Sequence, residues 1–377
     1  MQIILIGGKS TKIFAITQIF YDFFCLFAIF FIILHRKIMK LMKKCLFYAL
    51  LALVMMSCGS GNERLLTSAT GSIYECLVVS DAGVKDLLCE TMGADMYGLP
   101  QMEPYFTTNH VVPAQFDDLF KASRNLLLVD INPNKYTLVK ATKMRDVWST
   151  PQAVVRIQAP DQESLQTYWQ EHGEQIREWF VQEELARQIR FYRASTNKKA
   201  RAKLNKDGYD LLIPEDFMLI MDTTLANTHV LWCCNNKGPM RKDVLVYSQP
   251  YTAQEQFSGD SIIAKRDAVV GALVGAKIDG SYMGTEFKHF PPVTRQVTAL
   301  RDTVGGFYAM ETRGLWKMFG GASMGGPFVS LTRLDQVNGR VVTAEAFLYA
   351  PGQKKRNAMR QLEAILYSLE MPNERQR

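Results

Sequence analysis

The pattern in this chain that most resembles a catalytic motif is a glycine-flanked serine near the C-terminal end. Gly321, Ser323 and Gly325 match Gly-x-Ser-x-Gly, a motif in which a sharp strand-to-helix turn exposes a serine nucleophile beside backbone N–H donors. Here Gly326-Pro327 and a β-rich run follow in place of the helix, and the last histidine, His289, precedes the serine. A glycine-rich loop between strands is therefore favoured over a serine hydrolase.

The residues around this serine are of types that often bind partners. Arginine and tryptophan are common anchors at interfaces, and glycines let a backbone approach a partner closely. We therefore define a candidate binding loop, which consists of Arg313, Trp316, Ser323, Gly325, Gly326 and Phe328. The more economical alternative is a turn that the sheet geometry requires, with Trp316 in the core.

Cysteines and histidines give little support for metal or disulfide chemistry. After residue 58 the cysteines are Cys76, Cys89, Cys233 and Cys234, with no Cys-x-x-Cys pair, and the histidines occur singly. We therefore predict no metal site and no cofactor. Cys76 and Cys89 are candidates for a disulfide, because a strand and the helix that follows it pack together. Two buried free thiols are the alternative, and the sequence slightly favours it.

A short segment near the N-terminus predicts where the protein is held. Lys40, Lys43 and Lys44 precede an apolar run at 46–56, and Ser57-Cys58 follows it. This arrangement is typical of a lipoprotein signal peptide, and the run is shorter than the about 20 residues that a membrane-spanning helix needs. We expect cleavage before Cys58 and a lipid on its sulfur. The alternatives are a non-lipidated signal peptide and a membrane anchor.

Residues 1–38 contain a second apolar stretch, from Ile13 to Leu34, which is long enough for a transmembrane helix. An intact signal peptide with its own methionine follows, so we interpret residues 1–38 as an upstream extension from a misplaced start, or else as a transmembrane segment. Residues 1–57 hold seven of the 44 basic and one of the 37 acidic residues, which leaves 37 and 36. The expected mature chain is nearly neutral, and its charge does not support nucleic-acid binding.

Beyond residue 70 the hydrophobic pattern predicts an α+β fold with two mixed subdomains. Each is expected to have a largely antiparallel sheet and to be closed by a long amphipathic helix. Asp161 is a good N-cap for the first of these helices, which runs to about Tyr192, and 356–369 is the second. Strands are expected at 72–80, 125–130, 136–141, 153–158, 209–213, 217–222, 228–234, 242–248, 293–300, 306–313, 327–334 and 340–349. Asn338-Gly339 predicts a hairpin turn between the last two.

These features predict the following organisation. The parts are 1–38 (extension or transmembrane segment), 39–57 (signal peptide), 58–70 (tether), 71–196 (first α+β half), 197–207 (basic linker) and 208–377 (second α+β half). The linker is rich in lysine, from Lys198 to Lys206. We interpret it as an exposed connection or the end of a helix, with phosphate or lipid-headgroup binding as a minority alternative.

Several segments together resemble a family of uncharacterised Bacteroidetes lipoproteins, classed as a domain of unknown function. They are the signal ending at Cys58, Leu-Leu-Leu-Val-Asp at 126–130, Arg-Gly-Leu-Trp at 313–316 and Met-Gly-Gly-Pro-Phe-Val at 324–329. The resemblance covers about residues 40–372 and implies a bacterial cell-envelope location, without any activity or catalytic residues. In that group acidic residues just after the lipidated cysteine often signal surface export. Here the first acidic residue after Cys58 is Glu63, so residues 59–62 carry no such signal. This favours a protein that faces the periplasm.

Two functional hypotheses follow. The leading one is a non-catalytic binding or assembly module of the cell envelope, anchored by lipid on Cys58 and facing the periplasm. It would bind an envelope protein or a glycan, and no nucleic acid, through loops around Arg313 to Phe328. The alternative is an envelope hydrolase that uses Ser323 or carboxylates that the sequence does not identify. Whether the chain is an enzyme stays open, and the balance favours binding.

Overall fold

The computed structural model describes residues 66–275, 280–298, 308–320 and 323–371. All the elements below lie in the compact unit Leu66–Arg377. The predicted upstream extension, the signal peptide and the lipidation site Cys58 lie outside the described residues, as do Gly321 and Ala322 of the serine motif. Within the described part, no helix combines the length and the apolar character needed to cross a membrane.

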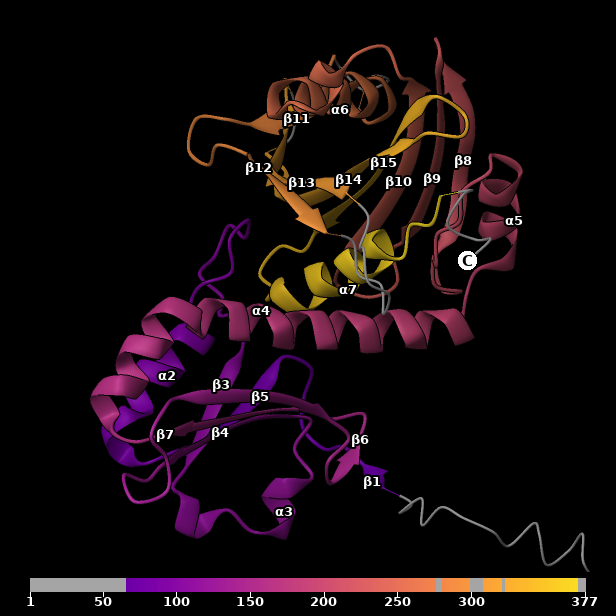
Figure 1. The fold of residues 1–377 in the computed structure, drawn as a ribbon. Helices are drawn as coiled ribbons and strands as arrows, with labels where there is room; N and C mark the ends of the chain where they lie inside the picture. Colours follow the sequence, from indigo (N-terminus) through magenta and orange to yellow (C-terminus); the bar gives the residue numbers. More distant parts are fainter. Residues whose placement is uncertain (1–65, 276–279, 299–307, 321–322, 372–377) are drawn as a thin grey trace, which may run out of the picture. The chain divides into compact units, whose positions relative to one another are not determined.

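A five-stranded sheet organises the first half of this unit (Figure 1). In the spatial order of the sheet, its strands are β3 (Thr107–Val111), β2 (Glu75–Val79), β4 (Asn125–Ile131), β7 (Ala153–Ala159) and β5 (Lys140–Arg145). The first four run parallel, and β5 is antiparallel to β7. A short parallel pair joins β1 (Thr67–Ser68) to β6 (Ser149–Thr150). Leu126 to Val129 of β4 are all buried, as expected for a strand covered on both faces.

Helices cover both faces of the five-stranded sheet. They are η1 (Ala82–Val84), α2 (Lys85–Met92), η2 (Pro113–Gln115), α3 (Asp118–Lys121) and α4 (Gln162–Ala194). Leu88 of α2 and Trp169 of α4 belong to the main core on one face. Phe116 and Phe120 pack against the small core on the other face. This two-sided cover explains why the three central strands β2, β4 and β7 are rich in apolar residues without strict alternation, whereas the edge strands β3 and β5 are largely polar.

An eight-stranded antiparallel sheet forms the second half. Its strands are β8 (Met218–Leu225), β9 (Thr228–Asn235), β10 (Arg241–Pro250), β11 (Tyr282–Glu286), β12 (Val293–Thr298), β13 (Tyr308–Phe319), β14 (Gly325–Asp335) and β15 (Arg340–Tyr349). The order is β11-β13-β14-β15-β10-β9-β8, and β12 also pairs with β13. Asn338-Gly339 lies in the turn between β14 and β15, and Gly339 adopts the positive φ of 57° that such a turn requires.

Side chains alternate between the two faces of this sheet, as the period of a strand demands. Val230 and Trp232 belong to a second core with residues of α6 (Gly259–Leu273). Leu231 and Cys233 belong to the main core with residues of α7 (Arg356–Tyr367). The main core therefore contains residues of both halves, because α4 packs against α7 as well as against its own sheet.

The predicted α+β class with largely antiparallel sheets is confirmed. In the described part, eight of the twelve strand pairs are antiparallel. The first half departs from this expectation, because helical connections cross between β2, β3 and β4 and thereby make these neighbours parallel. The basic segment expected as a linker forms a helix, α5 (Lys198–Lys206), capped by Asn197. The segment 209–213, expected as a strand, makes only an isolated bridge at Asp210.

Candidate functional site

The residues of the candidate binding loop lie mainly in strands and in the core. Arg313 and Trp316 belong to β13 and Phe328 to β14, and all three are buried. Gly326 of β14 pairs with Trp316 across the ladder. The prediction of an accessible binding loop is therefore wrong for these residues. The alternative, with Trp316 in the core, describes the structure: its indole Nε1 donates to the backbone oxygen of Leu348 at 3.2 Å.

The glycines of this stretch serve strand packing. A Cβ on Gly326 would lie 2.0 Å from the backbone oxygen of Leu348, and one on Gly325 would lie 2.8 Å from that of Trp316. Ser323 is exposed just before β14. In the described part of the chain, no hydrogen bond or ion pair joins it to a histidine or a carboxylate. The structure therefore supplies no base for a Ser323 nucleophile.

Arg313 is the centre of a buried charge network between β13 and α7. Its guanidinium donates to both carboxylate oxygens of Glu311 at 2.8 Å and to Oε1 of Glu363 at 2.6 Å. Arg360 donates to the other oxygen of Glu363 at 2.6 Å, and Tyr367 donates to Glu311 at 2.7 Å. Burial alone would raise the pKa of Glu311, but the charge of Arg313 holds that pKa below its usual range. Arg313 thus anchors α7 to the sheet and is not an anchor for a partner.

We expect Arg313→Met to lower the free energy of unfolding by about 3–5 kcal/mol, because it leaves two buried carboxylates without their shared cation. Urea denaturation followed by tryptophan fluorescence measures this. The control is Lys121→Met, which removes an ion pair with the fully exposed side chain of Asp118 and should cost under about 1 kcal/mol. Equal losses in the two variants would contradict the role assigned to Arg313.

A second prediction separates the glycine from the serine of the motif. Gly326→Ala should destabilise the fold by about 1–3 kcal/mol or more, because the added methyl group meets the backbone of β15. Ser323→Ala should change stability by less than about 0.5 kcal/mol, since its side chain is exposed. Thermal unfolding of both variants checks this. An unchanged melting temperature for Gly326→Ala would contradict the conclusion that the packing of the strands requires a glycine at this position.

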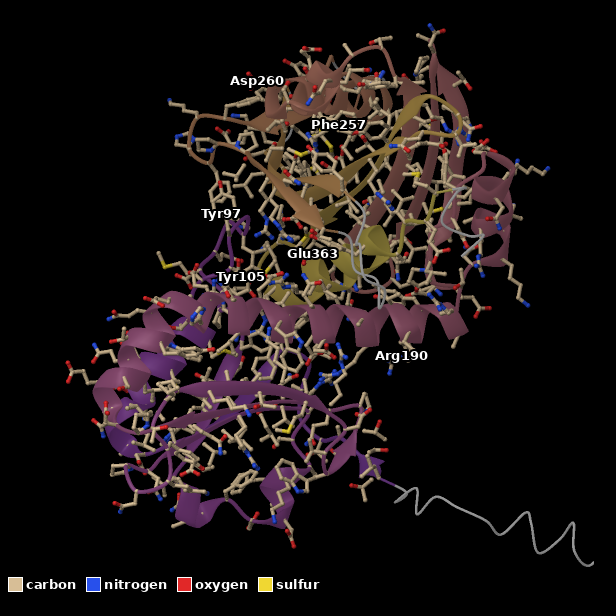
Figure 2. The ribbon with its side chains drawn as sticks, viewed as in Figure 1. Tyr97, Tyr105, Arg190, Phe257, Asp260 and Glu363 are labelled. Atoms are coloured by element: carbon tan, nitrogen blue, oxygen red, sulfur yellow. The ribbon has the colours of Figure 1, made fainter. Side chains whose placement is uncertain are left out.

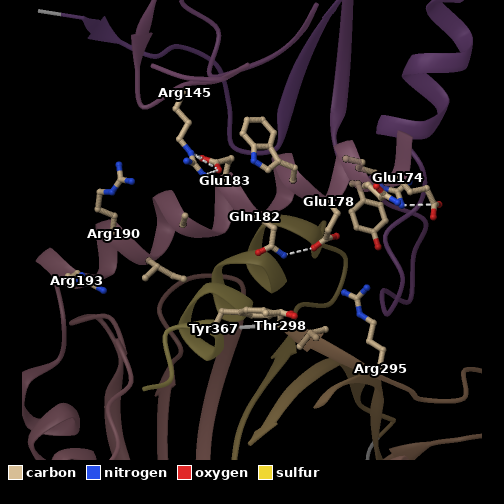
Figure 3. A pocket seen from close by; sticks show the side chains of 17 residues that line it. Arg145, Glu174, Glu178, Gln182, Glu183, Arg190, Arg193, Arg295, Thr298 and Tyr367 are labelled. Atoms are coloured by element: carbon tan, nitrogen blue, oxygen red, sulfur yellow. Dashed lines mark hydrogen bonds and ion pairs between the residues drawn. The ribbon is translucent and has the colours of Figure 1, made fainter. Parts of the chain in front are cut away.

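The best candidate for a functional site is a cavity of about 860 Å³ along α4. In Figure 3, Glu178 and Gln182 of α4 face Arg295 and Thr298 of β12 and Tyr367 of α7 across it. The cavity also reaches Arg145 of β5 and Tyr105. Its walls therefore come from both halves of the unit, and its position follows from the packing of α4 between them. Its volume is in the range of ligand-binding cavities.

Arginines dominate the lining of this cavity. They are Arg145, Arg177, Arg190, Arg193 and Arg295, and the acidic residues are Glu174, Glu178 and Glu183. Most of the arginines already have acidic partners. Arg145 binds Glu183 through both carboxylate oxygens at 2.6–2.9 Å. Arg177 lies 3.3 Å from Glu174, and Arg295 lies 2.8 Å from Glu311.

Arg190 and Arg193 differ from the others. Both are exposed, and in the described residues neither has an acidic partner. They are three residues apart on α4, so they lie on neighbouring positions of one helix face. They are also in the last turns of the helix, where its dipole favours cations. This explains how two unpaired arginines are tolerated there, and it leaves their guanidinium groups available to an anion.

No sequence motif pointed to this cavity. One signal was present, because no aspartate or glutamate occurs between Ala186 and Lys206. On α5, part of the basic charge is used internally: Arg201 binds Asp210 at 2.5 Å and Lys203 lies 2.8 Å from Asp222. The hydrogen bonds from Lys203 and His229 lower the pKa of Asp222. The charge run alone could not show which cations remain unpaired.

Ser80 and His110 form a serine–histidine pair that no sequence motif indicated. Ser80 Oγ lies 3.1 Å from His110 Nε2 and donates to the backbone oxygen of Asp81 at 3.1 Å, and the same Nε2 lies 3.1 Å from the backbone oxygen of Ser80. Since the one hydroxyl proton goes to Asp81, the histidine nitrogen must be the donor to Ser80. A protonated nitrogen cannot act as a base, and Ser80 is fully buried. The pair is structural.

The cysteines after residue 58 are all free thiols in the structure, including Cys76 and Cys89, for which the sequence allowed a disulfide. Burial raises the pKa of both thiols. Raised pKa values disfavour the thiolate, which is the reactive form. Cys233 and Cys234 point to opposite faces of β9, as expected for strand neighbours. Among the described residues, no group of three or more acidic, histidine or cysteine side chains could hold a metal ion.

Two known families match most of the described chain. Residues 69–193 match a domain of unknown function (DUF8532), and residues 196–368 match another, DUF4837. Both are domains of unknown function. This confirms the expected resemblance in its general form, and the assignment to Bacteroidetes lipoproteins stays a prediction. The first match ends one residue before the end of α4, and the second begins between α4 and α5.

Comparison with other proteins adds little. No curated protein matches the chain. The solution structure of cyanobacterial PsbP (CyanoP) from Synechocystis sp. PCC 6803 matches at 13% identity and a TM-score of 0.30, over 44% of this chain and 88% of that one. The lipid transfer and protein localization domain of human StarD13 (DLC2) matches at 10% identity and a TM-score of 0.15, over 40% and 88%. Likenesses this weak carry no argument about function.

Proposed function

We propose that this chain is a non-catalytic binding or assembly module of the bacterial cell envelope, anchored by lipid on Cys58 and facing the periplasm. The signal pattern from Lys40 to Cys58 supports the location. The neutral residues 59–62 after the cysteine support the periplasmic side. The binding role is supported by a different part of the chain from the one that the sequence suggested.

The observation that carries the binding proposal is the pair Arg190 and Arg193 at the edge of the cavity along α4. Two unpaired guanidinium groups on one helix face can bind a carboxylate or phosphate by charge-assisted hydrogen bonds. A guanidinium stays protonated at every physiological pH, so it is suited to binding and poorly suited to proton transfer. The proposed partner is an envelope protein or a glycan that carries acidic groups. The hydrolase alternative has no comparable observation in its favour.

The anchoring is tested with Cys58→Ser in the full-length chain. The parent chain should incorporate radiolabelled palmitate in a bacterial host, and its mature form should begin at Cys58 by mass spectrometry. The variant should incorporate none. A chain that starts at Met39 should behave like the parent if residues 1–38 are dispensable. Label on the Cys58→Ser variant, or a mature chain that keeps residues 39–57, would overturn the lipoprotein assignment.

The binding role is tested by reversing the two free charges. The double variant Arg190→Glu/Arg193→Glu should reduce recovery of the acidic partner from solubilised envelopes at least about ten-fold, equivalent to about 1.4 kcal/mol. Half-molar salt should weaken capture by the parent chain in the same way, because exposed charges are screened.

The matched control for this experiment is Lys198→Glu/Lys199→Glu, which makes the same change of charge on α5. Neither lysine lines the cavity along α4. This variant should retain the partner. An equal loss of partner recovery in the two double variants would show that net charge alone causes the effect. It would contradict a specific site at Arg190 and Arg193.

A further inference from the structure

A second cavity of about 510 Å³ lies at the end of α4 and shares no lining residue with the first. Its lining combines apolar side chains with polar and charged ones. Tyr192, Phe217, Leu362 and Ile365 are all buried side chains of its wall. Phe191, which is 65% exposed, lies on its rim. Apolar side chains beside placed polar groups are the usual components of a small-molecule site.

One cation of the lining, Lys242 of β10, is half-buried. Its ammonium carries three N–H donors. In the described part of the chain a single hydrogen bond uses one of them, to Oε1 of Gln361 at 2.7 Å. Burial lowers the pKa of Lys242, and the negative charge of Asp216 opposes this shift in part. Its strand neighbour Asp243 points to the other face, where it binds Arg241 and Trp232.

The other charges of this cavity lie at its rim. Lys237, Glu215 and Asp216 are exposed. Asp216 already accepts a hydrogen bond from the side-chain amide of Asn235 at 2.5 Å. The rim therefore carries two acidic groups and one basic group, while Lys242 is half-buried and its ammonium has no acidic hydrogen-bond partner among the described residues. A ligand with several negative charges would be repelled at the rim, whereas a single negative charge could be stabilised inside.

We propose that this second cavity binds a small monocarboxylate with an apolar body. The carboxylate accepts hydrogen bonds from the free N–H groups of Lys242. The apolar body packs against Tyr192 and Phe217, and Phe191 covers the entrance. Because α4, α7 and β10 all line the cavity, an occupant also ties these three elements together. This site is independent of the arginine-lined cavity and does not require the function proposed for it.

The test compares two ligands of the same shape. 4-Phenylbutyrate carries the carboxylate, and 4-phenylbutanamide replaces it with a neutral amide. Isothermal titration calorimetry on the unit Leu66–Arg377, which contains all three hydrophobic cores, should show that the acid binds at least about ten-fold more tightly than the amide. Lys242→Gln should remove this preference, whereas Lys237→Gln, a change at the rim, should keep it.

The ligand pair tests the proposal on the parent chain, so the outcome does not depend on whether a variant folds. Equal affinity of the acid and the amide for the parent chain would overturn the proposal. So would the absence of binding of the acid at millimolar concentration, or a Lys242→Gln variant that still prefers the acid. As a second readout, the acid should raise the melting temperature of the parent chain and leave that of Lys242→Gln unchanged.

Discussion

The buried pairing of Arg313 with Glu311 and Glu363 is the constraint on which the rest of the described structure depends. It links β13 to α7 through hydrogen bonds of 2.6–2.8 Å in a region closed to water. Charges buried in this way are stable only when every partner is present and well placed. The network therefore sets the position of α7 on the antiparallel sheet. Since α7 packs against α4, it also sets where the first half of the unit meets the second.

Both cavities lie along α4, the longest helix of the described part of the chain. Its 33 residues extend over about 50 Å. The helix packs against its own sheet and against α7, while Arg190 and Arg193 in its last turns have no acidic partner among the described residues. Figure 2 shows Arg190 near this end of α4, apart from Tyr105 and Glu363. Arg190 and Arg193 line one cavity, and Gln188, Phe191 and Tyr192 line the other. One helix thus lines both the arginine-rich cavity and the second cavity.

Several elements could be predicted because their signals are local. Asp161 caps α4 through the N–H of Ser164, Leu126 to Val129 form a buried strand, and Asn338-Gly339 turns β14 into β15. The candidate site could not be predicted in the same way. The same residue types, an arginine and a tryptophan among glycines, occur both in surfaces that bind partners and in buried cores. The residue that decides between these cases, Glu363, lies 50 positions beyond Arg313.

By itself, the sequence determined the class of the fold, the helices with clear caps and periodicity, and the expectation of a lipid-bearing Cys58. All of these depend on residues that are close together along the chain. Only the tertiary structure decided that β2, β3, β4 and β7 are parallel, that Gly326 makes room for the backbone of β15, and that Arg190, Arg193 and Lys242 keep free donors. The physical reason is that strand direction, steric fit and neutralisation of charge depend on neighbours in space, and a residue's type does not specify those neighbours.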